Sequence, residues 1–202
     1  VNGGRYIDPA FVERIQDRHG RTIYTRDGRV CETCSEIAWD HQAPPLLPDM
    51  RGQVVDPLSA YQIVSMLEGV VLRGTGRSIK ELGKPIGGKT GTTNDFRDAW
   101  FIGFSPDLAV GVYVGFDHPK SLGRRESGGK VAAPIFREFM RQALGETPAV
   151  PFRVPHGIRF VRVDSQTGLA ARQGDVNVLV EAFRIGTEPS PPSMTRTRSA
   201  TI

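Results

Sequence analysis

The chain has 202 residues, of which 39% are hydrophobic, and a formal charge of +4. This length and composition suit one globular domain with extensions and exclude a fibrous protein. The longest apolar run, residues 108–116, is too short to cross a bilayer, and the first residues have no charged-then-apolar pattern of a signal segment. The charges are spread along the chain without a basic helix, so we expect no nucleic-acid partner.

Two cysteines, Cys31 and Cys34, form one Cys-x-x-Cys pair, and no second pair or nearby histidine pair completes a zinc site. They predict a local disulfide or two free thiols rather than metal or redox chemistry. The four histidines are scattered without the spacing of metal ligands. The sequence therefore predicts neither a metal nor a cofactor.

Residues 1–26 are expected to form a peripheral hairpin. Apolar residues alternate up to Ile15, residues 17–20 are a turn sequence, and residues 22–24 favour a second strand. The composition then shifts to Cys, Pro, Asp and Gly, and a proline-rich stretch cannot form a regular helix or a central strand. We interpret residues 27–55 as an irregular surface insertion.

The clearest helix signal begins at Asp56-Pro57, because aspartate caps free amides and proline suits the first helical position. Gly74-Thr75-Gly76 ends this helix. Its expected buried stripe is Ala60, Val64, Leu67 and Val71, broadened by Tyr61 and Ile63. The residues expected to face water are Gln62, Glu68 and Arg73.

A second helix is expected from about Ala133 to Leu144, with Pro134 in its first turn and Gly145 beyond its end. Its expected apolar side contains Ile135, Phe136, Phe139, Met140 and Ala143. Between the two helices, residues 87–104 and 108–116 read as three strands of one sheet, with Lys89 on the first strand and Ser105-Pro106-Asp107 as the turn before the last. The fold class predicted is α+β, an antiparallel sheet with packed helices, and residues 56–145 form its core.

Beyond the core, residues 146–187 are expected to be a carboxyl-terminal extension. Residues 158–163 alternate as a strand does, residues 164–168 turn, and Leu169-Ala170 is expected to begin a return strand. Residues 188–202 are rich in Pro, Ser, Thr and Arg, so we expect a disordered tail.

The stretch with the most chemistry is Lys89-Thr90-Gly91-Thr92, which is predicted on a strand at the edge of a cleft. The lysine supplies a positive charge for a carboxylate and can assist proton transfer, and the threonines offer hydroxyls. An extended peptide could add alongside such a strand, with the amide after Gly91 donating to a developing oxyanion. Asp98 and Trp100 are interpreted as structural residues, and Arg124, Arg125 and Glu126 as a solvated loop.

Lys-Thr-Gly is one of three motifs found in penicillin-binding proteins and related β-lactamases, together with Ser-x-x-Lys and Ser-Asp-Asn. The segments 87–98, 99–115, 56–76 and 128–139 resemble, in order and spacing, the carboxyl-terminal half of the transpeptidase domain of class A penicillin-binding proteins of the 1A type. Asn2-Gly3-Gly4 resembles the family's sequence after its Ser-x-Asn motif. The resemblance covers nearly the whole chain.

The chain departs from the family pattern in two ways: it contains no Ser-x-Asn, and its only Ser-x-x-Lys is Ser127-Gly128-Gly129-Lys130. Gly128-Gly129 is a poor helix start, and Ser127 follows Lys89 whereas the family's nucleophile precedes it. We interpret Ser127 as a loop residue leading into the last helix. The chain alone is therefore expected to be inactive, and both missing motifs are expected upstream.

The resemblance implies a role for each residue of the Lys-Thr-Gly stretch. Lys89 would stabilise charge and assist a proton relay, and Thr90 and Thr92 would bind the terminal carboxylate of a D-Ala-D-Ala stem peptide or a β-lactam. The Thr92 amide would complete an oxyanion hole, and Gly91 and Thr93 would complete the substrate-binding set.

The resemblance also implies the setting of this chain. Its parent would be a peptidoglycan synthase on the periplasmic side of the bacterial inner membrane, with a glycan-polymerising domain and an anchor upstream. Its partners would be the stem peptide, β-lactam antibiotics and the remainder of the parent. A β-lactamase or D,D-carboxypeptidase, and a non-catalytic module that binds peptidoglycan or protein, are the alternatives.

Overall fold

The computed structural model describes residues 1–28 and 49–191. Cys31 and Cys34 lie outside the described residues, as does the whole proline-rich stretch, residues 43–48. The chain divides into two compact units, one of residues 4–54 and one of residues 1–3 with the chain from 55 onward.

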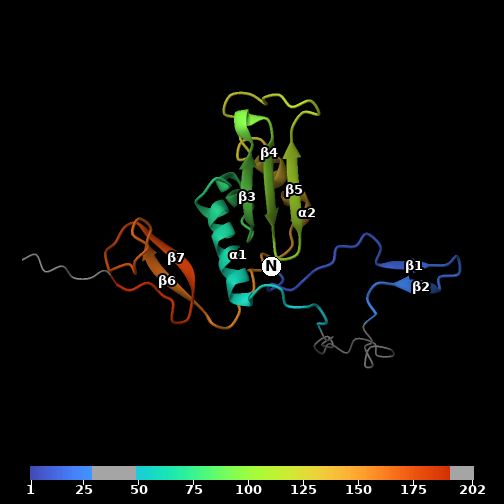
Figure 1. The fold of residues 1–202 in the computed structure, drawn as a ribbon, viewed down its shortest axis with the longest axis horizontal. Coiled ribbons are helices and arrows are strands. Elements are labelled where there is room, and N and C mark those ends of the chain that lie inside the picture. Colours follow the sequence, from blue (N-terminus) through green and yellow to red (C-terminus); the bar gives the residue numbers. More distant parts are fainter. Residues whose placement is uncertain (29–48, 192–202) are drawn as a thin grey trace, which may run out of the picture. The chain divides into compact units, whose positions relative to one another are not determined.

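The centre of the larger unit is an antiparallel sheet of three strands in the order β3-β4-β5. These strands are β3 (Gly87–Thr92), β4 (Ala99–Phe104) and β5 (Ala109–Val114). They stand side by side in Figure 1. The amides of Asp107 and Leu108 donate to the Ser105 hydroxyl, which closes the predicted turn between β4 and β5. The three strands predicted from the sequence are confirmed.

The two faces of this sheet have different surroundings. Ala99 and Phe101 of β4 are fully buried, whereas the intervening Trp100 and Ile102 are 40% and 56% exposed. Since side chains alternate along a strand, the first pair defines a covered face and the second an open face. Residues directly opposite each other in the register share a face, so Lys89 lies on the open face beside Ile102.

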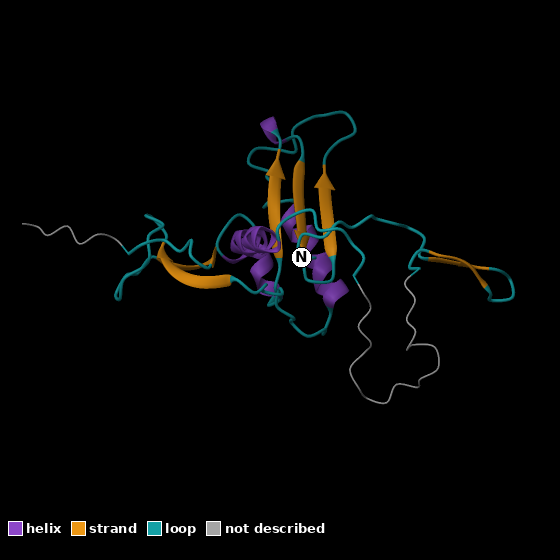
Figure 2. Ribbon diagram, turned by 60° about the horizontal axis from the view of Figure 1, so that its bottom comes forward, coloured by secondary structure: helices purple, strands orange, loops and turns teal. Residues whose placement is uncertain are grey.

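Helix α1 (Pro57–Leu72) packs beside β3, as Figures 1 and 2 show from two directions. Its start follows the prediction: Asp56 is the N-cap, its carboxylate accepts from the Ser59 amide at 2.8 Å, and Pro57 is the first residue. The hydrogen bond from the Ser59 amide is the largest cause of the lowered pKa of Asp56. A short 3₁₀ helix, η1 (Arg77–Leu82), follows and leads into β3.

The orientation predicted for α1 needs correction at two positions. Ile63 is 54% exposed, because the buried stripe follows Tyr61, Val64 and Val71 and leaves Ile63 on the opposite side. Glu68, which was expected in water, is half-buried, and burial raises its pKa.

Helix α2 (Ala132–Leu144) covers the buried face of the sheet, behind β4 and β5 in Figure 1. Phe136 and Phe101 are both fully buried with ring centroids 4.7 Å apart. The side of this helix predicted to be buried included two residues too many, since Ile135 and Phe139 are 49% and 50% exposed. The core joins residues of α1, η1, the position before β3, the sheet and α2: Val71, Ile79, Ile86, Ala99, Phe101, Ala132, Ala133, Phe136 and Met140.

The extension after α2 forms a second antiparallel sheet of β6 (Ile158–Asp164) and β7 (Val178–Arg184). β6 was predicted, but the return strand does not begin at Leu169, because Ala170 makes only an isolated bridge to Val163 and the chain turns again before β7. Residues 192–202 of the expected tail lie outside the described residues, and Glu188 at its start pairs with Arg159 at 3.0 Å.

Strand β7 also explains where the polar residues of α1 point. The Gln62 side chain donates to the Ala182 carbonyl at 3.0 Å, and Arg73 pairs with Glu181. A second small core joins the hairpin to the helix through Tyr61, Val64, Phe152 and Ala182. Gln62 and Arg73, both predicted to face water, therefore also contact the hairpin, and Arg73 remains exposed.

The smaller unit contains the hairpin of β1 (Arg14–Gln16) and β2 (Thr22–Thr25), which confirms the predicted strand, turn and strand. Both strands are exposed throughout. In the turn, the Asp17 carboxylate accepts from the amides of His19 and Arg21, and these bonds lower its pKa.

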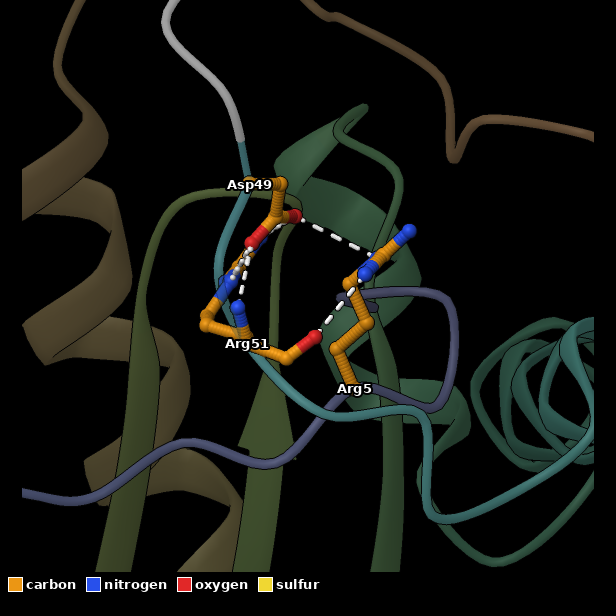
Figure 3. Close-up of polar contacts among 3 residues, drawn as sticks. All are labelled: Arg5, Asp49 and Arg51. Carbon is orange, nitrogen blue, oxygen red and sulfur yellow. Dashed lines mark hydrogen bonds and ion pairs between the residues drawn. The ribbon is translucent and has the colours of Figure 1, made fainter.

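The base of this unit is closed by a short clasp, which we define as Gly4–Tyr6 with Asp49–Val54. The Tyr6 amide donates to the Gly52 carbonyl at 2.8 Å, and the Val54 amide to the Gly4 carbonyl at 3.0 Å. Figure 3 shows Asp49 between Arg51 and Arg5: Arg51 donates to both carboxylate oxygens at 2.8 Å, and the Arg5 Nε lies 3.3 Å away. This pairing, with Arg51 as its main cause, holds the pKa of Asp49 well below its usual range.

The chain thus combines antiparallel sheets with packed helices, as the predicted α+β class requires. Within residues 1–28 and 49–191, no helix has the length and apolar character needed to span a membrane.

Candidate functional site

The candidate site is built around β3, which is an edge strand of the three-stranded sheet. Lys89 is exposed on the open face, and its ammonium donates to the Thr90 carbonyl at 2.7 Å. The same nitrogen lies 3.5 Å from the Thr90 hydroxyl oxygen, at the limit of a hydrogen bond. The Lys89 side chain therefore folds back and places its ammonium next to the backbone of β3.

Thr90 and Thr92 alternate with Lys89, so their side chains belong to the other face of the strand. Each hydroxyl also contacts a residue outside β3. The Thr90 Oγ1 lies 2.8 Å from the Thr75 Oγ1, and either oxygen could be the donor. The Thr92 Oγ1 accepts from the Gly128 amide at 3.0 Å. The two threonines are thus fixed by two different loops.

The loop that begins α2 lies directly on the backbone of β3 and β4. A Cβ at Gly128 would lie 2.3 Å from the Trp100 carbonyl oxygen and 2.4 Å from that of Gly91, and a Cβ at Gly129 would lie 2.8 Å from the Thr75 carbonyl oxygen. Only glycine fits both positions. The glycine pair inside the Ser-x-x-Lys sequence therefore has a packing reason.

Ser127 lies in the loop before α2, where it was expected. Its carbonyl accepts from the amides of Lys130 and Val131 at 2.9 Å. This turn carries the chain from the loop after β5 into α2.

The end of β3 is tied to the other two strands by Asp98. The Thr93 hydroxyl donates to one carboxylate oxygen of Asp98 at 3.1 Å and accepts from the Asp98 amide at 2.9 Å. The Tyr113 hydroxyl donates to the other oxygen at 2.8 Å. Thr93, which was predicted to bind substrate, therefore has its hydroxyl engaged in the strand connection.

This connection contains an uncommon backbone conformation. Asp95 and Phe96 have φ angles of 58° and 55°, which non-glycine residues rarely adopt. The Phe96 carbonyl accepts from the Leu122 amide at 2.8 Å, so the loop after β5 supports the turn.

Tyr113 and Trp100 pack together on the open face, with ring centroids 4.7 Å apart. The hydrogen bond to Asp98 is the largest cause of the raised pKa of Tyr113, because it is made by the protonated hydroxyl. These contacts agree with the structural roles expected for Asp98 and Trp100.

The resulting arrangement places one ammonium and two hydroxyls within a single edge strand. Its chemistry suits an anionic group of an extended ligand, since an ammonium and hydroxyls donate to a carboxylate and a strand edge pairs with a peptide backbone. Three contributors were missed from the sequence: Thr75, Gly128 and Tyr113. Only the glycine pair carried a signal, since adjacent glycines often mark a close backbone approach.

Comparison with known proteins identifies the family. A profile described as "Penicillin binding protein transpeptidase domain" matches residues 1–141. Penicillin-binding protein 1A of Rickettsia bellii is 49% identical over 187 residues, which cover 92% of this chain and 23% of the relative. Penicillin-binding protein 1A of Pseudomonas aeruginosa is 34% identical over 224 aligned residues, which cover 96% of this chain and 27% of the relative.

A crystal structure of Penicillin-Binding Protein 1A from Haemophilus influenzae matches with a TM-score of 0.75 and 31% identity, covering 96% of this chain and 31% of that one. The chain therefore belongs to the penicillin-binding protein transpeptidase family, and its fold is the one found there. Both of these relatives are of the 1A type, as the resemblance predicted. This chain spans about a quarter of the length of those relatives.

Proposed function

We propose that this chain forms the Lys-Thr-Gly wall of a serine D,D-transpeptidase site in a peptidoglycan synthase. In the parent protein this site cross-links stem peptides and is acylated by penicillin. The observation that carries the proposal is the β3 strand, where an ammonium and two separately anchored hydroxyls lie at a sheet edge. Membership of the transpeptidase family supports the reaction class.

Each residue has a defined part in this proposal. Thr90 and Thr92 donate their hydroxyl hydrogens to the terminal carboxylate of the D-Ala-D-Ala peptide or of the β-lactam. Lys89 adds positive charge near that carboxylate and assists the proton relay to the nucleophile. The Thr92 amide donates to the oxyanion, and Gly91 leaves space for the acyl group.

The acyl-accepting serine in this proposal comes from a part of the parent outside these 202 residues. The sequence contains no Ser-x-Asn, and its one Ser-x-x-Lys has two glycines whose positions are set by packing against β3 and β4. We place the parent on the periplasmic side of the inner membrane, with a glycan-polymerising domain and an anchor outside this chain.

Labelling with fluorescent penicillin tests the proposal. The intact parent should be labelled, and Lys89→Ala should slow acylation by at least about a hundredfold, as expected when a group that stabilises transition-state charge is removed. Lys80→Ala is the matched control, because Lys80 is an exposed lysine of η1, and it should leave the rate unchanged. Equal rates in the wild type and Lys89→Ala would contradict the proposed site.

The same experiment separates the alternatives. The isolated chain should not be labelled, and covalent label on its Ser127 would overturn the assignment of the nucleophile. Reversible binding of a stem peptide without acylation of the parent would favour a non-catalytic module, which the absence of Ser-x-Asn in this sequence would also suit. Hydrolysis without transfer to an amine acceptor would favour a β-lactamase or carboxypeptidase.

A further inference from the structure

Thr75 lies in the connection between α1 and η1 and shares a hydrogen bond with Thr90. We propose, on the basis of the proposed function of Thr90 in binding a carboxylate, that Thr75 is a positioning residue that turns the Thr90 hydroxyl hydrogen toward the carboxylate of a bound ligand.

The position of Thr75 is fixed by its neighbours. The amides of Gly74 and Gly76 both donate to the Val70 carbonyl, at 3.1 and 3.0 Å, so the backbone on either side of Thr75 is tied to the last turn of α1. On its other side, the Thr75 carbonyl lies where a side chain on Gly129 would clash. The Thr75 hydroxyl is therefore presented to β3 by a connection whose backbone is held on both sides.

The hydroxyls of Thr92 and Thr90 differ in the kind of hydrogen-bond partner that each one has. Thr92 accepts from a backbone amide, which can only donate, so its own hydrogen remains available for a ligand. Thr90 instead faces another hydroxyl, which can donate or accept. The hydrogen of Thr90 is available to a ligand only when Thr75 is the donor of the pair.

Which threonine donates in the Thr75–Thr90 hydrogen bond depends on what else contacts the Thr90 hydroxyl. In the free protein the Lys89 ammonium lies 3.5 Å from the Thr90 oxygen and can only donate, which favours Thr90 as donor to Thr75. A carboxylate accepts and cannot donate, so its arrival requires Thr90 to donate outward and Thr75 to become the donor to Thr90. Thr75 thus acts on the ligand through Thr90, without touching it.

The test compares Thr75→Val, which keeps the shape but lacks the hydroxyl, with Thr75→Ser, which keeps the hydroxyl. Acylation rate constants are measured on the intact parent with benzylpenicillin and with its methyl ester, which lacks the anionic carboxylate. Thr75→Val should lower the rate with benzylpenicillin by about five- to tenfold, the usual worth of one hydrogen bond. Thr75→Ser should stay within about twofold of the wild type, since it preserves that bond.

The inference further requires that the loss be specific. The ratio of wild-type to Thr75→Val rates should be near one with the methyl ester, and Thr75→Val should add no further loss to Thr90→Val. Thr22→Val, on an exposed strand of the other unit, is the control for a hydroxyl lost elsewhere. An unchanged midpoint of thermal unfolding in Thr75→Val, and in a Thr75→Ala variant, would exclude a general folding defect.

Three results would overturn the role of Thr75: an unchanged rate in Thr75→Val, an equal loss with the ester, or no rescue by serine. Each is distinct from failure of the proposed function itself, which would appear as a wild-type parent that benzylpenicillin does not acylate.

Discussion

The two faces of the three-stranded sheet are built in different ways. On the covered face, apolar side chains of β4 pack against α2, and Phe101 and Phe136 are completely buried. On the open face, Trp100, Ile102 and Tyr113 remain between 40% and 56% exposed, and order comes from an aromatic pair and from hydrogen bonds to Asp98.

The covered face contributes most of the stability of the fold, and the open face carries the Lys89 ammonium. Burial of apolar area stabilises the fold, and most of that burial lies on the α2 side of the sheet. Lys89 lies on the opposite side, where its ammonium remains accessible. Substitutions on the covered face should therefore change the free energy of unfolding, and those on the open face should change it little.

The largest expected effect is at Phe136. Phe136→Ala should destabilise the chain by about 3–5 kcal/mol, because it leaves a cavity in a packed core. Phe139→Ala, three residues further along the same helix and 50% exposed, should cost less than about 1 kcal/mol. Urea unfolding followed by fluorescence measures both. Equal losses would show that both sides of α2 are covered in solution.

Two glycines of the sheet give a matched pair of smaller effects. At Gly103, on the covered face, an added Cβ would lie 2.7 Å from both the Phe101 and Phe136 rings. At Gly111, opposite Ile102 on the open face, it would meet only the Ile102 side chain at 3.9 Å. Gly103→Ala should cost about 1–3 kcal/mol through overpacking, and Gly111→Ala should be close to neutral, within about 0.5 kcal/mol.

The smallest expected effect is on the open face and depends on pH. The hydrogen bond to Asp98 raises the pKa of Tyr113, so the folded chain holds the phenolic proton more tightly than the unfolded chain does. The stability from this bond is fully present below the unfolded pKa of about 10 and is lost as pH rises through the folded pKa.

Ultraviolet titration of tyrosinate should show this directly. Asp98→Asn should lower the pKa of Tyr113 toward its ordinary value, whereas Asp107→Asn, in the turn after β4, should leave it unchanged. A Tyr113 pKa that is unaffected by Asp98→Asn would show that the open face is not ordered by this bond.

Much of the fold could be predicted, because periodic apolar residues and capping signals are local. The Asp56 cap, both long helices and strands β3 to β5 follow from residues within one or two turns of each other. The outward-facing residues of α1 could not be predicted in the same way. Gln62 and Arg73 meet β7, more than a hundred residues later, and no local pattern encodes that contact.

The residues of the candidate site also divide into those encoded by a local sequence pattern and those brought in by contacts between distant residues. Lys89, Thr90 and Thr92 could be proposed from the sequence because they form one continuous motif, and their roles stay a prediction. Thr75 and Gly128 could not, since each meets β3 only after the chain has folded back over 15 and 36 residues. A hydroxyl in a short connection has the same local pattern whether or not it faces another strand.

The clasp at the base of residues 4–54 has a consequence for how this family member can change. Because Gly4 and Val54 are joined by a hydrogen bond, the intervening chain begins and ends at one place. Closing a longer loop there costs only about 0.6 kcal/mol for each doubling of its length. Evolution can therefore lengthen, shorten or replace this excursion while the spacing between Gly3 and the helix that follows Val55 stays the same.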